Sequence, residues 1–197
     1  MKKVLTVMAL FVLAQMMFGS GAQAKDVTKK WELSGMGSAI FPADDQTDTT
    51  WYAGGRLTYD VTPNLAFGVE SGYTSLDLTI DNVGAGDLRV IPVLADVILK
   101  YPIEATDNAI VPYIFGGVGA IMWHYNPSST YKSLGSVSGN DTVFGGKVGG
   151  GVDCFLNENI AVFVEGSYLW SGDIDTGSIQ GTDLHYGFAG AGIKLAL

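Results

Sequence analysis

The sequence predicts an all-β protein, an eight-stranded antiparallel transmembrane β-barrel that follows an N-terminal signal peptide. Three observations predict this fold class. The 197-residue chain has 47% hydrophobic residues and a mean hydropathy of +0.25, yet after the signal peptide it offers no stretch suited to a transmembrane helix. Apolar and polar residues alternate with a period of two. Short turns alternate with long loops, as in barrels that cross a lipid bilayer.

The first 24 residues have the features of a secretory signal peptide. Lys2 and Lys3 precede an apolar run over residues 4–18, and Ala22-Gln23-Ala24 forms a small-residue cleavage site. The apolar run is shorter than the roughly 20 residues that span a bilayer. We therefore expect two regions, a signal peptide over residues 1–24 and a barrel over residues 25–197. Loss of the two lysines changes the formal net charge from −9 to −11, which argues against nucleic acid as a partner.

The remaining composition argues against several other classes of protein. The most apolar segment, residues 109–123, is too short for a spanning helix and contains Pro112 and three glycines. A closed barrel is the other structure that satisfies every backbone amide in lipid. Cys154 is the single cysteine, so no disulfide forms within the chain and we interpret it as a small apolar wall residue. Gly146-Lys147 lacks the following Ser or Thr of a phosphate-binding loop.

Eight strands are expected, each long enough to cross a bilayer at a tilt. They cover residues 30–41, 51–60, 65–74, 89–101, 109–125, 142–155, 160–170 and 183–197. The second strand shows the alternation most clearly. Its outward positions are predicted to be Trp51, Ala53, Gly55, Leu57 and Tyr59, and its inward positions Tyr52, Gly54, Arg56, Thr58 and Asp60.

Long loops are expected at residues 42–50, 76–88, 126–141 and 172–182, on the extracellular side. Aromatic residues near the strand ends resemble the girdles at membrane interfaces. These are Trp31, Phe41, Trp51, Tyr101, Trp123, Tyr125, Tyr168 and Trp170.

Three turns predict the pairing register. Asn64, Asn108 and Asn159 each fit the last position of a three-residue hairpin loop, because Asn tolerates the left-handed conformation. The strand pairs would then begin with residues that all face outward. These first pairs are Val61 with Leu65, Ala105 with Ala109, and Leu156 with Ile160.

The same register places charged residues inside the barrel. Arg56 falls opposite Glu70, and Lys147 also points inward, because Phe144, Val148 and Val152 occupy the outward positions of its strand. Buried charges need partners, so we expect a lumen ion-pair network. Its members would be Arg56, Glu70, Lys147, Glu165, Asp96 and Asp153. Two interpretations stay open, an interior plug and a gate or selectivity filter.

Two further features of the lumen are predicted. The inward glycines 145, 149 and 151 should make room for large side chains from neighbouring strands. The inward positions of the fourth and fifth strands are expected to be unusually apolar. This apolar lining comprises Val90, Leu94, Ile98, Ile114, Val118 and Met122, together with Pro92, Ile110 and Pro112. A narrow apolar passage and a packed apolar interior explain these residues equally well.

The segments 111–120 and 145–170, together with the signal peptide and the strand count, resemble the small eight-stranded outer-membrane barrels of the OmpW-like, OmpA-type and opacity-type families. The OmpW-like family is favoured because of the apolar lining. The resemblance implies the bacterial outer membrane, a narrow passage for small hydrophobic molecules, outer-membrane lipids and lipopolysaccharide as partners, help from the barrel-insertion machinery, and a monomer. Members of these families usually end on an aromatic residue, whereas this chain ends on Leu197.

Two other functions are compatible with a small barrel, an enzyme and an adhesive or structural surface protein. A lipid-modifying enzyme on this scaffold would need His followed two residues later by Ser, and neither His124 nor His185 has that neighbour. We therefore expect no catalytic residues, metal site or cofactor. The alternative to a passage is a structural or adhesive barrel, whose acidic loops contact lipopolysaccharide or a partner surface. The loop acids are Asp44, Asp45, Asp48, Asp77, Asp81, Asp87, Asp173 and Asp175.

Overall fold

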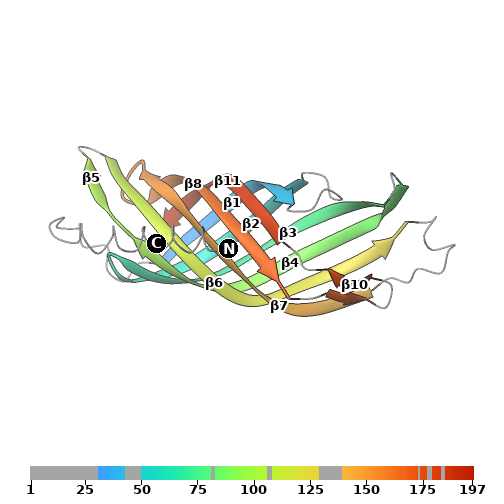
Figure 1. The fold of residues 1–197 in the computed structure, drawn as a ribbon. Coiled ribbons are helices and arrows are strands. Elements are labelled where there is room, and N and C mark those ends of the chain that lie inside the picture. Colours follow the sequence, from blue (N-terminus) through green and yellow to red (C-terminus); the bar gives the residue numbers. More distant parts are fainter. Residues whose placement is uncertain are drawn as a thin grey trace, which may run out of the picture.

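The computed structural model describes residues 31–42, 50–80, 83–105, 108–128, 139–172, 174–176, 179–182 and 185–197, and the predicted signal peptide lies outside these ranges. Eight long antiparallel strands form the barrel (Figure 1). They are β1 Trp31–Pro42, β2 Thr50–Thr62, β3 Leu65–Ile80, β4 Val83–Lys100, β6 Asn108–Pro127, β7 Gly139–Phe155, β8 Ile160–Ser171 and β11 His185–Ala196. Three short strands accompany them, β5 Ile103–Ala105, β9 Ile174–Thr176 and β10 Ile179–Thr182. No helix in the described ranges is long and apolar enough to cross a membrane.

The sheet closes into a ring, because β1 pairs with both β2 and β11 and β4 pairs with β6. Paired residues can be followed once around the barrel from Glu32. The path returns to β1 at Pro42, so the stagger of the ring is ten residues. Eight strands with this stagger tilt by about 40° and enclose a backbone cylinder of about 8 Å radius. An interior of this size is filled by side chains.

The predicted strands are confirmed, but the predicted loop over residues 76–88 is wrong, and the predicted loop over residues 172–182 contains the short strands β9 and β10. Residues 76–88 were expected to form a long loop, whereas β3 continues to Ile80 and β4 begins at Val83. Leu76 pairs with Leu88, and both side chains are buried inside. The hairpin is longer than expected because this apolar inward pair extends the alternation of both strands beyond the predicted ends.

The predicted register is confirmed along the strands of two of the three hairpins, and at the turn itself for one of these two. Arg56 pairs with Glu70 between β2 and β3, although Val61 does not face Leu65 as predicted. A bulge there leaves Thr62 opposite Leu65. The Thr62 side-chain oxygen accepts hydrogen bonds from the backbone N–H of Asn64 and Leu65.

Between β7 and β8, Phe155 pairs with Ala161, as the predicted register requires. The Leu156 N–H donates to the Ile160 carbonyl at 2.9 Å, so these two residues face each other as predicted. The side chain of Asn157 accepts from the N–H groups of Asn159 and Ile160 and so holds the turn closed.

The third predicted register is wrong by one residue. Ala105 pairs with Asn108 rather than with Ala109, and the same register continues to Asp96 opposite Gly117. A shift of one residue moves every side chain of a strand to the opposite face. The odd-numbered residues of β6 therefore point inward and the even-numbered ones outward. Sequence alone did not reveal this error, because both faces of β6 are apolar.

Aromatic residues mark two levels on the outer surface. Trp31 and Phe41 both point outward from β1, with 50% and 51% of their surface exposed. Ten residues on a strand tilted by about 40° rise about 25 Å, close to the height of the apolar band of outer-membrane barrels. Trp51, Tyr168 and Trp170 also point outward, as predicted. Trp123 and Tyr125 do not belong to a girdle, because they lie on the inward face of β6 and are buried.

Inward glycines of β7 make room for aromatic side chains from β6. A Cβ atom on Gly149 would lie 2.8 Å from the ring of Phe115, and one on Gly151 would lie 2.6 Å from the Tyr113 hydroxyl. A Cβ atom on Gly145 would collide with Ile121. At all three positions, glycine therefore makes room for a large side chain of the neighbouring strand, as predicted.

We predict that Gly149→Ala destabilises the barrel by about 1–3 kcal/mol, because the added methyl group overpacks the interior against Phe115. Gly37→Ala is the matched control. No atom lies within 4 Å of the position that its Cβ would take. Urea unfolding of the refolded protein in lipid vesicles measures both. Equal stability of the two variants would contradict the packing described here.

Candidate functional site in the barrel interior

The interior is arranged in layers along the strands. From the short-turn end, the inward side chains of β2 run Asp60, Arg56 and Tyr52, and β4 and β8 likewise carry apolar residues beyond their charges. Ten charged residues are buried in the described part of the chain. We name Arg56, Glu70, Asp96, Lys147 and Glu165 the central ionic cluster. Glu32, Asp60, Lys100, Asp153 and Lys194 form the lower ionic cluster, nearer the short turns.

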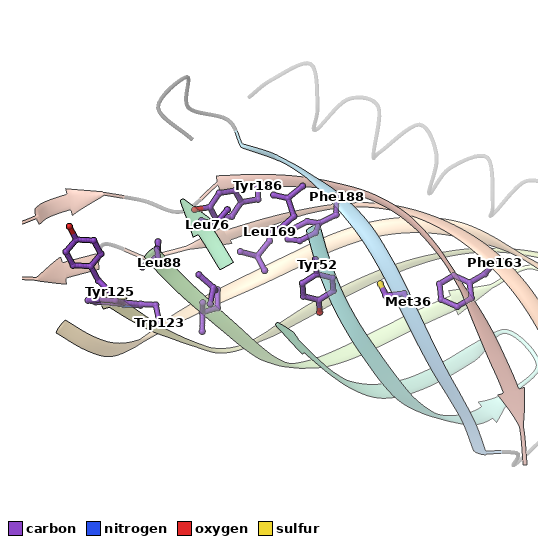
Figure 2. Close-up of a cluster of buried hydrophobic side chains, with 13 residues drawn as sticks. Met36, Tyr52, Leu76, Leu88, Trp123, Tyr125, Phe163, Leu169, Tyr186 and Phe188 are labelled. Carbon is purple, nitrogen blue, oxygen red and sulfur yellow. The ribbon is translucent and has the colours of Figure 1, made fainter. Parts of the chain in front are cut away.

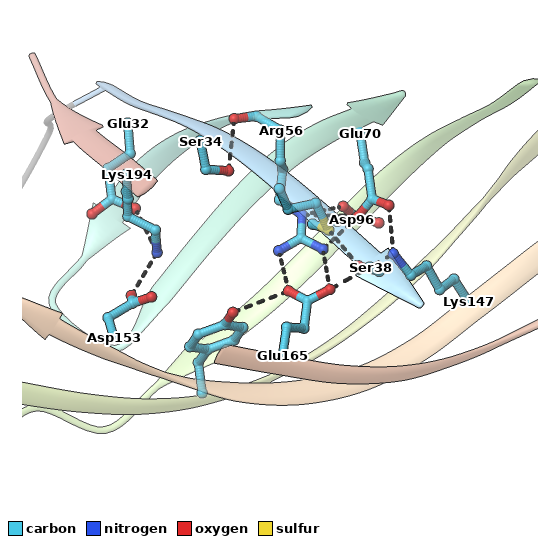
Figure 3. A network of polar contacts seen from close by, with 12 residues as sticks. Glu32, Ser34, Ser38, Arg56, Glu70, Asp96, Lys147, Asp153, Glu165 and Lys194 are labelled. Carbon is cyan, nitrogen blue, oxygen red and sulfur yellow. Dashed lines mark hydrogen bonds and ion pairs between the residues drawn. The ribbon is translucent and has the colours of Figure 1, made fainter. Parts of the chain in front are cut away.

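Arg56 is the hub of the central ionic cluster (Figure 3). Its Nη1 donates to Glu165 Oε2 at 2.9 Å, and its Nε donates to Asp96 Oδ2 at 3.0 Å. Its Nη2 and Nε both donate to Glu70 Oε2. The guanidinium carbon lies 4.3 Å from the ring centre of Phe115. One arginine thus binds carboxylates from β3, β4 and β8 while an aromatic ring covers its face.

Lys147 supplies the second cation of the central ionic cluster. Its Nζ donates to Glu70 Oε1 at 2.5 Å and lies 3.7 Å from Glu165 Oε1. Two tyrosine hydroxyl groups donate further hydrogen bonds to these two glutamates. The Tyr52 hydroxyl donates to Glu70 at 3.1 Å, and the Tyr113 hydroxyl donates to Glu165 at 3.0 Å. Each glutamate therefore contacts both cations and one hydroxyl group, which offsets the loss of water around a buried carboxylate.

Of the lower ionic cluster, the sequence predicts only Asp153 as a member of a lumen ion-pair network. Lys100 Nζ donates to Glu32 at 2.8 Å and to Asp60 at 2.6 Å. Lys194 Nζ donates to Asp153 and lies 3.5 Å from Glu32. Asp153 was expected to hold Arg56 or Lys147, but its partner is Lys194. The inward position of Lys100 could have been predicted, because Lys100 lies four residues from Asp96 on the same strand and so on the same face.

Each ionic cluster holds three carboxylates and two cations, and each leaves one carboxylate oxygen unpaired. Asp96 Oδ1 and Asp153 Oδ1 are buried and accept no hydrogen bond. Asp96 packs directly against the backbone of β6, where a Cβ atom on Gly117 would collide with its free oxygen. Glycine at this position leaves room for the close approach of the carboxylate, and a larger residue would displace it.

An apolar cluster occupies the interior beyond the ions (Figure 2). It comprises Met36, Ile40, Tyr52, Leu76, Leu88, Val90, Ile121, Trp123, Tyr125, Phe163, Leu169, Tyr186 and Phe188. Most of these residues lie between the central ionic cluster and the long-loop end. The Trp123 Nε1 is buried there and has no hydrogen-bond partner among the described residues.

The predicted apolar lining is present on β4 and absent on β6. Val90, Leu94 and Ile98 point inward, with at most 4% of their surface exposed. Ile114, Val118 and Met122 point outward, contrary to the prediction, and Ile110 and Pro112 share their face. The error follows from the one-residue shift at the hairpin before β6. In the lumen, Ile121 and Trp123 of β6 take the place of the predicted even-numbered residues.

The described residues contain no group of three His, Cys, Asp or Glu side chains placed to hold a metal ion. The acidic loop residues Asp44, Asp45, Asp48, Asp81 and Asp173 lie outside the described residues, as do the side chains of Asp77 and Asp175. Asp87 is half-buried on the outward face of β4. Cys154 is exposed on the outer wall, as expected for a wall residue.

Comparison with known proteins agrees with this architecture. The family described as outer membrane protein beta-barrel domain matches residues 10–194. No curated protein matches the sequence. Among solved structures, the outer membrane protein OprG from Pseudomonas aeruginosa is similar over 90% of this chain and 99% of its own, at 15% identity and a TM-score of 0.60.

Two further structures share the fold. Neisserial surface protein A is similar over 84% of this chain and 95% of its own, with 15% identity and a TM-score of 0.59. The N-terminal beta-barrel domain of OprF from Pseudomonas aeruginosa is similar over 86% of this chain and 98% of its own, with 16% identity and a TM-score of 0.55. At such identities the similarity concerns the fold.

We predict that Arg56→Met destabilises the barrel by about 3–5 kcal/mol, because Glu70, Asp96 and Glu165 lose a buried cation together. The double variant Arg56→Met/Glu165→Gln should recover part of this loss, since one stranded carboxylate is neutralised. Urea unfolding of the single and double variants measures the coupling. Arg89→Met, which removes an exposed arginine from the same barrel, is the control and should change stability little. A loss of stability no larger than that of the control would contradict the hub position of Arg56.

Proposed function

Because the chain belongs to the outer membrane protein beta-barrel domain family and is therefore a barrel of the bacterial outer membrane, we propose that it is a closed, non-enzymatic barrel without a continuous passage. One observation carries this proposal, the bridge that Arg56 makes across the interior. Arg56 extends from β2 and contacts Glu165 on β8, and the strands β1 and β11 separate the two on the nearer side of the ring. The contact therefore crosses the lumen.

A second bridge supports closure at nearly the same level. Lys147 extends from β7 and contacts Glu70 on β3, two strands that are not neighbours in the ring. The backbone cylinder has a radius of only about 8 Å, so two such bridges with Phe115 between them occupy much of its cross-section.

The lower ionic cluster adds contacts across the lumen at a second level. Lys100 of β4 contacts Glu32 of β1, and Lys194 of β11 contacts Asp153 of β7. An apolar solute moving through the barrel would have to separate both sets of buried ion pairs, and a broken buried pair costs several kcal/mol. The β6 residues expected to line a passage, Ile114, Val118 and Met122, face the membrane, and Phe115 of β6 packs against Arg56 in the lumen instead.

A narrow site for small hydrophobic molecules is the second candidate, favoured by the apolar cluster alone. Val90, Ile121 and Leu169 lie beyond the central ionic cluster, towards the long-loop end. Within the described interior, a solute that enters from the long-loop end would meet these apolar residues before the central ionic cluster. This candidate needs a route that does not run through the ionic clusters.

We predict that planar bilayers containing the protein show no steady conductance, because the two bridges close the lumen. Arg56→Ser/Glu165→Ser removes one bridge without changing the net charge and leaves the Lys147–Glu70 pair intact. Single-channel recording should show openings in this variant. Arg89→Ser is the control and should stay silent.

Three results of this recording separate the interpretations. Steady wild-type openings of the same amplitude as those of the double variant would overturn the closed barrel. Brief wild-type openings would instead identify the central ionic cluster as a gate, since Glu70 and Glu165 can each exchange between Arg56 and Lys147. Continued silence of a correctly folded double variant would show that the lower ionic cluster closes the lumen by itself.

Uptake of a small hydrophobic solute into liposomes tests the second candidate. Leu94→Trp adds bulk at a fully buried position inside the barrel, whereas Ile114→Trp adds the same residue on the lipid-facing side. We predict equal, background-level uptake for the wild type and both variants. Wild-type uptake above background that Leu94→Trp abolishes and Ile114→Trp preserves would favour the hydrophobic site over the closed barrel.

A further inference from the structure

The polarity of the outer surface changes abruptly near the long-loop end of β4 and β6. Along the membrane band the outward residues are apolar and end with the cross-strand pair Ile91 and Met122. The next outward pair towards the exterior is Arg89 with His124, and both side chains are exposed. The edge of the hydrocarbon layer therefore lies between these two outward pairs, which are two residues apart on each strand.

Arg89 and His124 are direct neighbours across the two strands. Directly paired residues have Cβ atoms about 4.5–5.5 Å apart, so a single small anion can contact both side chains. The same row continues with Ser75, which pairs with Arg89, and with Asn140, which pairs with His124. Four adjacent strands thus present a row of four residues that can donate hydrogen bonds.

Neither side chain of the pair has a polar partner among the described residues. The Arg89 guanidinium and the His124 ring form no hydrogen bond or ion pair with described residues. The remaining Lys and Arg residues in the described ranges are Arg56, Lys100, Lys147 and Lys194, and all four are buried in the lumen. Arg89 is therefore the one arginine or lysine that the described part of this acidic chain presents outside.

The height of the pair relates it to the lipid headgroups. Arg89 lies two residues beyond Ile91 on a strand tilted by about 40°, which places it about 5 Å beyond the last apolar side chain. Lipid phosphates lie at this level, just outside the hydrocarbon, and a guanidinium binds phosphate through two parallel hydrogen bonds. A protein whose formal net charge is −9, or −11 without the predicted signal peptide, would otherwise repel an anionic lipid surface.

We propose that Arg89 and His124 form a binding site for a phosphate group of an outer-leaflet lipid headgroup. Arg89 supplies the charge and the paired donors, and His124 adds an N–H donor beside it. Ser75 and Asn140 extend the row to either side. The acyl chains of the bound lipid would lie along the apolar surface below, which begins at Ile91 and Met122. The site is on the outer wall, so it does not depend on whether the lumen is closed.

Asp87 is the one carboxylate on the same face of β4 near the pair. It lies two residues beyond Arg89, about 7 Å along the strand, and pairs with Asn126. A carboxylate at this distance weakens phosphate binding to Arg89. It would strengthen binding if a divalent cation bridged the carboxylate and the phosphate. Asp87→Asn therefore distinguishes direct binding from a metal bridge.

The experiment measures retention of diphosphoryl lipid A by the full-length mature chain, refolded in a neutral detergent, with native mass spectrometry. We expect Arg89→Gln and His124→Gln to lower the affinity, with a loss on the order of tenfold for Arg89. Asp87→Asn should bind as tightly as the wild type or more tightly. His185→Gln, at the same end of the barrel on β11 where His185 stacks on Tyr168, should leave binding unchanged.

Several outcomes would overturn the proposal. Unchanged binding in a folded Arg89→Gln/His124→Gln double variant is one, and equal binding of dephosphorylated lipid A is another. Loss of binding in Asp87→Asn together with sensitivity to a chelator would assign the contact to a bridging metal. Full displacement by millimolar inorganic phosphate would assign the site to free phosphate rather than to a lipid. Folding of each variant is checked by its heat-dependent mobility in gels, and all substituted side chains lie outside the packed interior.

Discussion

The structure depends on one constraint, that every backbone amide inside the hydrocarbon must find its partner within the sheet. Closure of the ring through the β1–β11 and β4–β6 pairings meets it. Closure with a stagger of ten residues then fixes the tilt and the radius, and the radius leaves room for side chains alone. The inward glycines of β7 and the aromatic residues of β6 that lie against them follow from the same limited volume.

Charges in so narrow an interior are costly unless they are paired. Arg56 meets this need by binding three carboxylates from three strands, and Glu32 does so by contacting both Lys100 and Lys194. Three of these contacts, Arg56 with Asp96, Arg56 with Glu165 and Lys100 with Glu32, join strands that are not neighbours in the sheet. They therefore act as cross-links that brace the cylinder as well as filling it. Closure of the lumen and stability of the wall thus come from the same interactions.

The outer surface is organised by its surroundings rather than by its own contacts. Along β4 and β6 the outward residues change from Ile91 and Met122 to Arg89 and His124 within a single step. On the same strands the inward residues Val90 and Trp123 remain apolar across that level. The two faces of one strand therefore match different environments. The outward face meets first lipid chains and then headgroups, whereas the inward face meets a packed core throughout.

The sequence by itself determined the eight strands, the alternation of their faces and the Arg56–Glu70 pair, because each depends on residues close in sequence or joined by a short turn. It failed on the face of β6, since both faces of that strand are apolar and a one-residue error at the preceding hairpin left no contradiction. Only the tertiary structure decided which carboxylates surround Arg56 and which lysine holds Asp153. Those partners lie on strands that are distant in sequence, and the closure of the ring brings them together across the lumen.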